Sequence, residues 1–247
     1  MKTAMKNRQF INSPITTIFE EAIMSTDCLK GKMSMFPVVE YIFHSLFLKT
    51  SGAMEQKVHA IVLEIARHNI DVSRELIGGN FKNNSALEDK EKIFKELAKQ
   101  IILLSEEDIT IDLPKHWSNS VSQIRSLFDT SAFKPCMSQE FTSFKKIAQS
   151  IQLPQTTIRL SIKGSADKGI FSDASKLKNI YDKHLYKTRN NLAHNSMVGK
   201  LNLPTIRILS SQDYVFNNFF LFFAIFTFID DIFMHVFKQY MELLELY

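Results

Sequence analysis

The sequence predicts a mainly α-helical protein, and three observations support this fold class. The 247 residues include only 7 glycines and 6 prolines, which leaves little room for the tight turns of a β-sandwich or barrel. From Val38 onward, apolar residues recur at steps of three and four, the spacing of a helix with one buried face. The 21 phenylalanines indicate bulky aromatic packing between the helices, in a chain long enough to bury a sizeable core.

Composition and charge narrow the class of protein further. The net charge of +4 gives a mild preference for anionic partners. The sequence lacks the run of basic residues that forms a nucleic-acid tail. Cys28 and Cys136 have no CxxC neighbours, so they fit neither a disulfide scaffold nor a zinc site. Residues 1–14 lack the continuous apolar stretch of a signal peptide. We therefore expect a cytoplasmic protein with two reduced thiols.

The first third of the chain predicts helices over 13–25 and from 36 to 79. In the second region, Ser51 and Gly52 either divide the pattern into two helices or lie within one long helix. Gly78 and Gly79 are expected to end it. The apolar face of this region comprises Val39, Ile42, Phe43, Leu46, Met54, Val58, Ile61, Val62 and Ile65.

The middle of the chain, residues 80–170, alternates helical segments with proline breaks. Ser85 and Glu88 have the spacing of a capping box and predict the start of a helix. Its expected apolar face comprises Ile93, Leu97, Ile101 and Leu104. Further along, the pattern predicts a short helix near 119–128, a helix over 141–151, and a strand or extended arm over 156–163.

The last third predicts two more helices, one over 175–194 and one from Ser210 or Ser211 nearly to Tyr247. The final helix contains the most apolar stretch of the chain, the eleven residues Phe219 to Ile229. As a helix this stretch spans roughly 16 Å, whereas a bilayer core needs about 30 Å. We therefore expect it to be buried in a core or a subunit interface rather than in a membrane.

Residues 186–196, with the sequence YKTRNNLAHNS, hold the candidate functional residues. On a helical wheel, Asn190 and His194 are neighbours four residues apart, on a face nearly opposite the expected buried stripe. Arg189 lies roughly 140° around the helix from His194. These two side chains converge only if the helix ends or distorts here, or if a second copy of the chain supplies one of them. The buried stripe is expected to comprise Leu177, Tyr181, Leu185, Thr188 and Leu192.

This motif resembles the signature of the HEPN (higher eukaryotes and prokaryotes nucleotide-binding) superfamily, an arginine, a polar residue and then a histidine after a gap of four to six residues. The run from Arg189 through Asn190 to His194 matches it, and the resemblance extends over 172–247 and, more weakly, 36–79. It implies one HEPN-containing domain over residues 1–247, an antiparallel helical bundle with an insertion at about 80–170. Ser196 stands where some toxin members carry tyrosine.

The resemblance implies a metal-independent endoribonuclease that needs no cofactor. His194 would be the general acid and base, Arg189 would stabilise the charged phosphate, and Asn190 would position one or both. One histidine per chain implies a symmetric homodimer with RNA as its substrate. The implied setting is bacterial antiphage defence or a toxin–antitoxin system, with an antitoxin or regulatory protein as a further partner and no membrane.

Other interpretations of the same residues remain open. Asparagines near a helix end often cap it, and arginine or histidine there favours the helix dipole, so the chain is alternatively a non-catalytic module that binds a nucleotide or a protein. His184 is expected to be packed or hydrogen-bonded. Asp230 and Asp231 are expected to pair with lysine or arginine rather than to bind a metal, and Lys145 is expected to be solvated.

Overall fold

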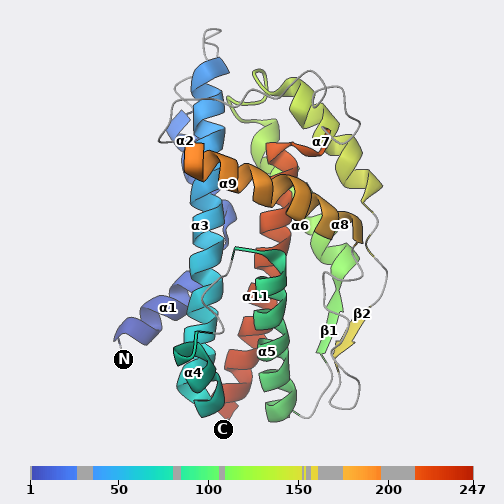
Figure 1. Cartoon of the computed structure of the whole chain (residues 1–247). Coiled ribbons are helices and arrows are strands. Elements are labelled where there is room, and N and C mark those ends of the chain that lie inside the picture. Colours follow the sequence, from blue (N-terminus) through green and yellow to red (C-terminus); the bar gives the residue numbers. More distant parts are fainter. Residues whose placement is uncertain are drawn as a thin grey trace.

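A computed structural model of the chain describes residues 2–26, 36–79, 85–105, 109–151, 153, 157–160, 175–195 and 215–246. The fold is mainly helical, which confirms the predicted class. Long helices run side by side along the molecule, and a further helix crosses their front face (Figure 1). The arrangement follows from one very apolar helix near the C-terminus, around which the others pack.

Two short helices open the chain, α1 (Lys2–Asn12) and α2 (Thr16–Thr26). Helix α2 confirms the helix predicted over 13–25, whereas α1 was not predicted because its sequence is mostly polar. Ile11 and Phe19 are fully buried and attach this region to the core.

Helix α3 (Phe36–His68) runs without interruption through Gly52, so the predicted apolar pattern forms one long helix. Asn69 then caps α4 (Ile70–Ile77), because its side-chain oxygen accepts hydrogen bonds from the backbone N–H groups of Asp71 and Val72. The positive φ of 87° at Gly79 favours glycine at the predicted stop.

The continuity of α3 gives a first expected result. A Cβ added at Gly52 would meet nothing within 4 Å, so Gly52→Ala should raise the free energy of unfolding by about 0.5–1 kcal/mol through the lower chain entropy of the unfolded state. Urea denaturation measures this change. Gly79→Ala is the matched control and should destabilise, because its φ of 87° strains any residue with a Cβ. Equal effects of the two substitutions would contradict the helical backbone at Gly52 and the positive φ at Gly79.

The middle region forms α5 (Leu87–Ser105), β1 (Ile109–Asp112), α6 (Leu113–Asp129), α7 (Ser138–Ser150) and β2 (Thr157–Leu160). Strand β2 confirms the predicted extended segment, and it pairs antiparallel with β1, which was not predicted. The capping-box prediction is wrong, because α5 begins two residues after Ser85. The backbone oxygen of Ser85 instead accepts hydrogen bonds from two side chains described below.

Helix α11 (Phe219–Leu246) is the central helix of the fold. The predicted start at Ser210 or Ser211 is corrected to Phe219, because residues 215–218 precede the α-helix and Asn218 caps it by accepting from the N–H of Leu221 at 3.1 Å; residues 210–214 lie outside the described part. By length and composition alone α11 could cross a membrane, yet 78% of its most apolar window is buried inside the fold. The phenylalanine-rich stretch is therefore a core element.

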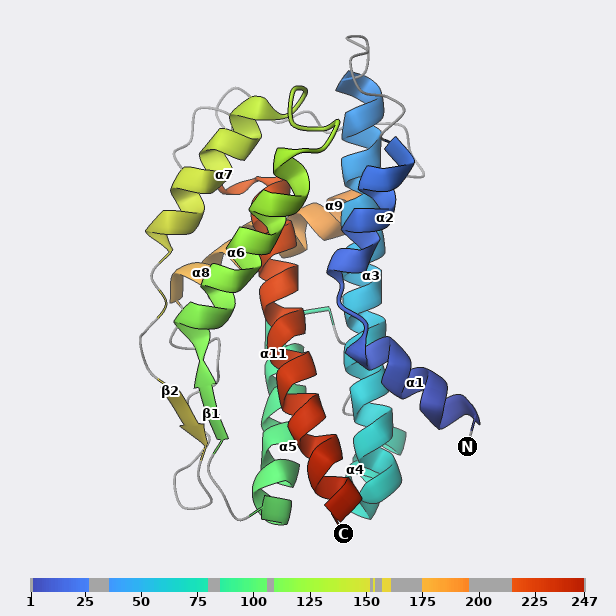
Figure 2. The same cartoon turned by 180° about the vertical axis from the view of Figure 1, so that it is seen from behind.

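Helices α3, α5, α6 and α7 surround α11 and share one hydrophobic core with it. Figure 2 shows α6 lying along α11 on the side opposite α8 and α9. The ring of Phe128 on α6 stacks on Phe223 of α11 at 5.8 Å between centroids, and Trp117 meets Phe228 edge-on at 5.7 Å. Residues from the expected insertion at 80–170 thus complete the same core. The boundaries of this insertion relative to HEPN proteins stay a prediction.

Candidate functional site

The predicted helix over 175–194 is one continuous helix in three parts. Helix α8 (Ser175–Ile180) leads into a π-helical turn, η2 (Tyr181–Leu185), and then into α9 (Tyr186–Asn195). The N–H of Tyr186 donates to the backbone oxygen of Tyr181, as expected for a π-turn. The helix crosses in front of α3 and α11 (Figure 1).

The buried stripe predicted on this helix is confirmed in its first half. Leu177, Tyr181 and Leu185 are at most 2% exposed. Thr188 and Leu192 are only partly buried, and Leu192 packs at the edge of the core. Arg189 and His194 of one chain could converge only if the helix were distorted between them. The π-helical distortion lies instead at 181–185, before Arg189.

His194 and Asn190 lie where the helical wheel placed them. His194 is exposed and Asn190 is partly exposed, one turn earlier on the same face. Arg189 Nη1 donates to Asn190 Oδ1 at 3.2 Å, so the chain brings these two side chains together. Since α9 stays α-helical through His194, Arg189 and His194 of one chain point in directions roughly 140° apart. The imidazole is therefore open to solvent rather than packed in the core.

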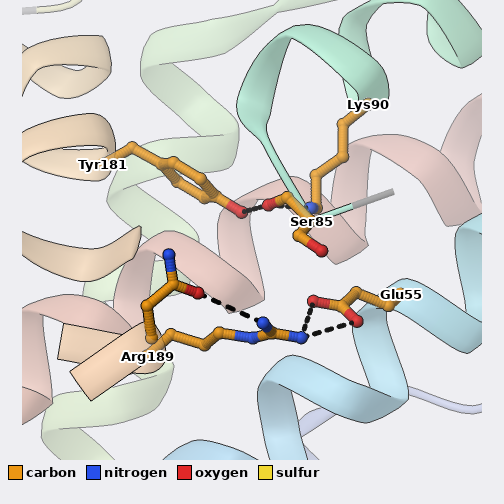
Figure 3. Close-up of polar contacts among 6 residues, drawn as sticks. Glu55, Ser85, Lys90, Tyr181 and Arg189 are labelled. Carbon is orange, nitrogen blue, oxygen red and sulfur yellow. Dashed lines mark hydrogen bonds and ion pairs between the residues drawn. The ribbon is translucent and has the colours of Figure 1, made fainter. Parts of the chain in front are cut away.

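Arg189 is held by a carboxylate that the sequence did not single out. Its Nη2 lies 3.0 Å from Glu55 Oε1 and 3.2 Å from Oε2 (Figure 3). The two side chains are 27% and 24% exposed, so the pair is partly shielded from water and is stronger than a surface ion pair. Glu55 belongs to α3, and the contact fixes both the direction of the guanidinium and the position of α9 on the bundle.

A buried polar layer lies beside this ion pair. Lys90 Nζ and the Tyr181 hydroxyl both donate to the backbone oxygen of Ser85, at 3.0 and 2.9 Å (Figure 3). The ammonium of Lys90 also lies 5.5 Å from the centre of the Tyr181 ring, a cation–π contact. Lys90 and Tyr181 are 1% and 2% exposed, so both are buried. Their shared contacts join α5 to η2.

Burial lowers the pKa of Lys90 to about 8, an effect that Glu55 and Asp89 oppose and Arg189 strengthens. Burial also raises the pKa of Tyr181, and the carboxylate of Glu55 adds to that rise. Arg189, Lys90 and Glu55 therefore interact electrostatically. The two cations, Arg189 and Lys90, are thus balanced by two carboxylates, Glu55 and Asp89.

The low pKa of Lys90 predicts how stability depends on pH. Between pH 8 and about 10.4 the unfolded lysine binds more protons than the folded one, so the free energy of unfolding should rise with pH, by about 3 kcal/mol in total. The Lys90→Met variant should lose that rise, which urea titrations at pH 7, 8, 9 and 10 would measure. A wild type and a variant with parallel pH curves would contradict the burial of a charged lysine here.

The sequence did contain a signal for Lys90 but little for Glu55. Lys90 is in phase with Ile93 and Leu97 on the apolar face of α5, a position where a lysine is unusual and indicates a special partner. Glu55 interrupts no apolar periodicity, and its partner is 134 residues away. Such a pairing depends on how α9 crosses α3, which local patterns do not specify.

The remaining candidates have structural partners. His184 Nδ1 forms a hydrogen bond with Asn217 Oδ1 at 3.0 Å, as expected for a bonded histidine. Asp230 pairs with Lys57, and Asp231 lies 2.5 Å from His116 Nδ1. Lys145 pairs with Asp129 and contacts the ring of Phe141, so it is not simply solvated. Within the described ranges, no group of three or more His, Cys, Asp or Glu side chains could hold a metal ion.

Of the two thiols, Cys136 is free and partly buried, and Cys28 lies outside the described residues.

Comparisons with known proteins add no assignment to this site. No family model, no curated protein and no solved structure matches the chain.

Proposed function

We propose that this protein is a metal-independent endoribonuclease of the HEPN type that acts as a homodimer. The observation that carries the proposal is the exposed imidazole of His194, on the same helix face as Asn190. Asn190 in turn accepts a hydrogen bond from Arg189, whose direction Glu55 fixes. The motif residues, the helical fold and the long apolar helix after the motif all agree with the resemblance. By the same resemblance, we propose a setting in bacterial antiphage defence or a toxin–antitoxin system, with a regulatory protein as a further partner.

The chemistry follows from the residue types. One imidazole, as general base, removes the proton of a ribose 2′-hydroxyl, whose oxygen attacks the adjacent phosphorus. The bond from phosphorus to the 5′-oxygen breaks, and the imidazolium formed in the first step donates its proton to that leaving oxygen. The phosphorus intermediate gathers negative charge, which the guanidinium of Arg189 stabilises with paired N–H donors. The products are a 2′,3′-cyclic phosphate and a 5′-hydroxyl.

A second copy of the chain completes this site. Each chain supplies one His194, and its own Arg189 points away from it along a regular helix. If two α9 helices face each other across a two-fold axis, the arginine of one subunit approaches the histidine of the other.

Glu55 gives Arg189 its orientation in this proposal. Both carboxylate oxygens bind the single nitrogen Nη2, and Nη1 donates to Asn190. A guanidinium fixed in advance loses less side-chain entropy when it binds a phosphate. Lys90 compensates the charge of Glu55, because at pH 7 it is mostly protonated with a pKa of about 8.

One observation favours a second candidate function, a non-catalytic helical module. Arg189 already has a carboxylate partner within its own chain and ties α9 to α3 without any ligand. In such a module, Arg189 and Asn190 stabilise the helix, and the exposed face of α9 binds a nucleotide or a protein.

Incubation of the purified protein with total RNA in EDTA separates the two functions. The proposal expects cleavage fragments with 2′,3′-cyclic phosphate or 3′-phosphate ends and 5′-hydroxyl ends, since no step uses a metal. Mapping of the RNA ends, together with the mass of the protein in solution, measures both the chemistry and the dimer. A monomeric protein that leaves tRNA, mRNA and rRNA intact would favour the module.

A further inference from the structure

The helix from Ser175 to Asn195 carries an unusual share of the charge of this protein. It contains Lys176, Lys178, Lys183, Lys187 and Arg189 but one acidic residue, Asp182, and so has a net charge of +4. The whole chain also has a net charge of +4. Acidic and basic residues therefore balance over the rest of the chain, and the excess positive charge resides on the one helix that holds the Arg–Asn–His motif.

Six exposed side chains of this helix form a continuous row, which we call the basic ridge; Asp182 and Ala193 are also exposed but are not in this row. The six follow each other at steps of three and four, opposite the buried stripe, and comprise Lys176, Asn179, Lys183, Lys187, Asn191 and His194. From the first to the last member the ridge is roughly 27 Å long. Because the helix crosses in front of α3 and α11 (Figure 1), the ridge lies on the outer side of the bundle.

The lysines of the ridge differ in their contacts within the chain. Lys176 Nζ donates to the backbone oxygen and the hydroxyl of Ser150, at 3.1 and 3.0 Å, and both of these acceptors are neutral. Lys178 is not part of the ridge and lies 3.4 Å from Glu88. Lys183 and Lys187 are exposed in the middle of the ridge, about three turns and about two turns before His194.

We propose that the basic ridge binds the phosphates of single-stranded RNA and leads the strand to His194. This inference rests on the proposed function and names the substrate class of the same site. A row of exposed cations binds a polyanion by releasing its counterions. The asparagines between the lysines can hydrogen-bond the exposed edges of unpaired bases. A convex helix cannot enter the deep, narrow major groove of A-form RNA, so the ridge fits a single strand better than a duplex.

The test measures binding separately from cleavage. A fluorescent 2′-O-methyl RNA 20-mer lacks the attacking hydroxyl, so its anisotropy reports affinity without turnover. The variant K183Q/K187Q should weaken binding about three- to tenfold near 0.1 M salt. It should also reduce the slope of log affinity against log salt by about 1.4, since each lost contact to a single strand contributes about 0.7. Both residues are exposed, so folding should not change.

The matched control K115Q/K238Q removes the same charge from exposed positions on α6 and α11 and should leave the affinity nearly unchanged. Equal losses in both double variants, or no loss in K183Q/K187Q, would overturn the proposal. So would tighter binding of an RNA duplex of the same length. Ridge-dependent binding to phosphatidylserine vesicles without RNA binding would assign the surface to a membrane and also overturn it.

The two proposals can fail separately in this experiment. Ridge-dependent binding of the 2′-O-methyl strand, with unmodified RNA left intact, would support the ridge and contradict the nuclease. Cleavage of unmodified RNA with affinity unchanged in K183Q/K187Q would support the nuclease and contradict the ridge.

Discussion

The His194→Ala variant should cleave RNA about 10²–10⁴-fold more slowly than the wild type, the range for loss of a general acid or base. Its imidazole is exposed on α9, so the substitution removes the proton transfer without removing a core contact. Single-turnover cleavage of a labelled RNA in EDTA measures the rate. Arg189→Ala should lower the same rate by about 10²–10³-fold, as expected for one lost donor to a charged intermediate.

His59→Ala is the matched control, because His59 is also exposed and lies on α3. It should cleave like the wild type. Circular dichroism should show the same helicity for all three variants. Arg189→Ala also leaves Glu55 without its ion-pair partner, so its unfolding curve should be measured beside its rate. If the wild type cleaves RNA and the His194→Ala variant cleaves it equally fast, His194 is not the general acid and base.

The second large effect is expected at the buried ion pair of α11. Asp230→Ala should lower the free energy of unfolding by about 3–5 kcal/mol, because it leaves the ammonium of Lys57 buried without its counter-charge. Asp230 Oδ1 lies 2.5 Å from Lys57 Nζ, and Oδ2 accepts from the N–H of Ile15 at 2.8 Å. Lys57 also donates to the backbone oxygen of Ser13 at 2.6 Å. The pair thus joins the segment between α1 and α2 to the centre of the fold, and urea denaturation measures its loss.

Two comparisons make this second result specific. Glu21→Ala breaks an ion pair with Lys49 whose side chains are 70% and 61% exposed, and should change stability by no more than about 0.5 kcal/mol. Burial raises the pKa of Asp230 and lowers that of Lys57, so each charge needs the other. The double variant Lys57→Met/Asp230→Leu should therefore lose less stability than Asp230→Ala. An Asp230→Ala protein as stable as Glu21→Ala would contradict this account.

The helices could be predicted because their apolar residues repeat with the helical period. The pattern from Val39 to Ile65 continued through Gly52 because the burial of this apolar face outweighs the roughly 1 kcal/mol that one glycine costs a helix. Strand β1 leads directly into α6 at Leu113, and its pairing with β2 comes from a distant segment of the chain, which local patterns do not reveal. The start of α11 depended on the cap at Asn218, which local apolarity does not reveal.

For the candidate site, the sequence predicted which residues share a face but not what they touch. The four-residue spacing placed Asn190 beside His194 and away from the core, as the structure has them. The position of Asp230 in an apolar run likewise predicted a cationic partner, and Lys57 is that partner. Glu55 could not be predicted as the partner of Arg189, because the contact depends on how two helices cross.

In the proposed dimer, the arginine of one subunit and the histidine of the other act on the same phosphate. Mixing inactive Arg189→Ala and His194→Ala proteins under conditions that exchange subunits tests this claim directly. A mixed dimer contains one site with both residues, so cleavage should return to about a quarter of the wild-type rate when half of the dimers are mixed. If the wild type cleaves RNA and the exchanged mixture stays as inactive as either variant alone, the shared site is wrong.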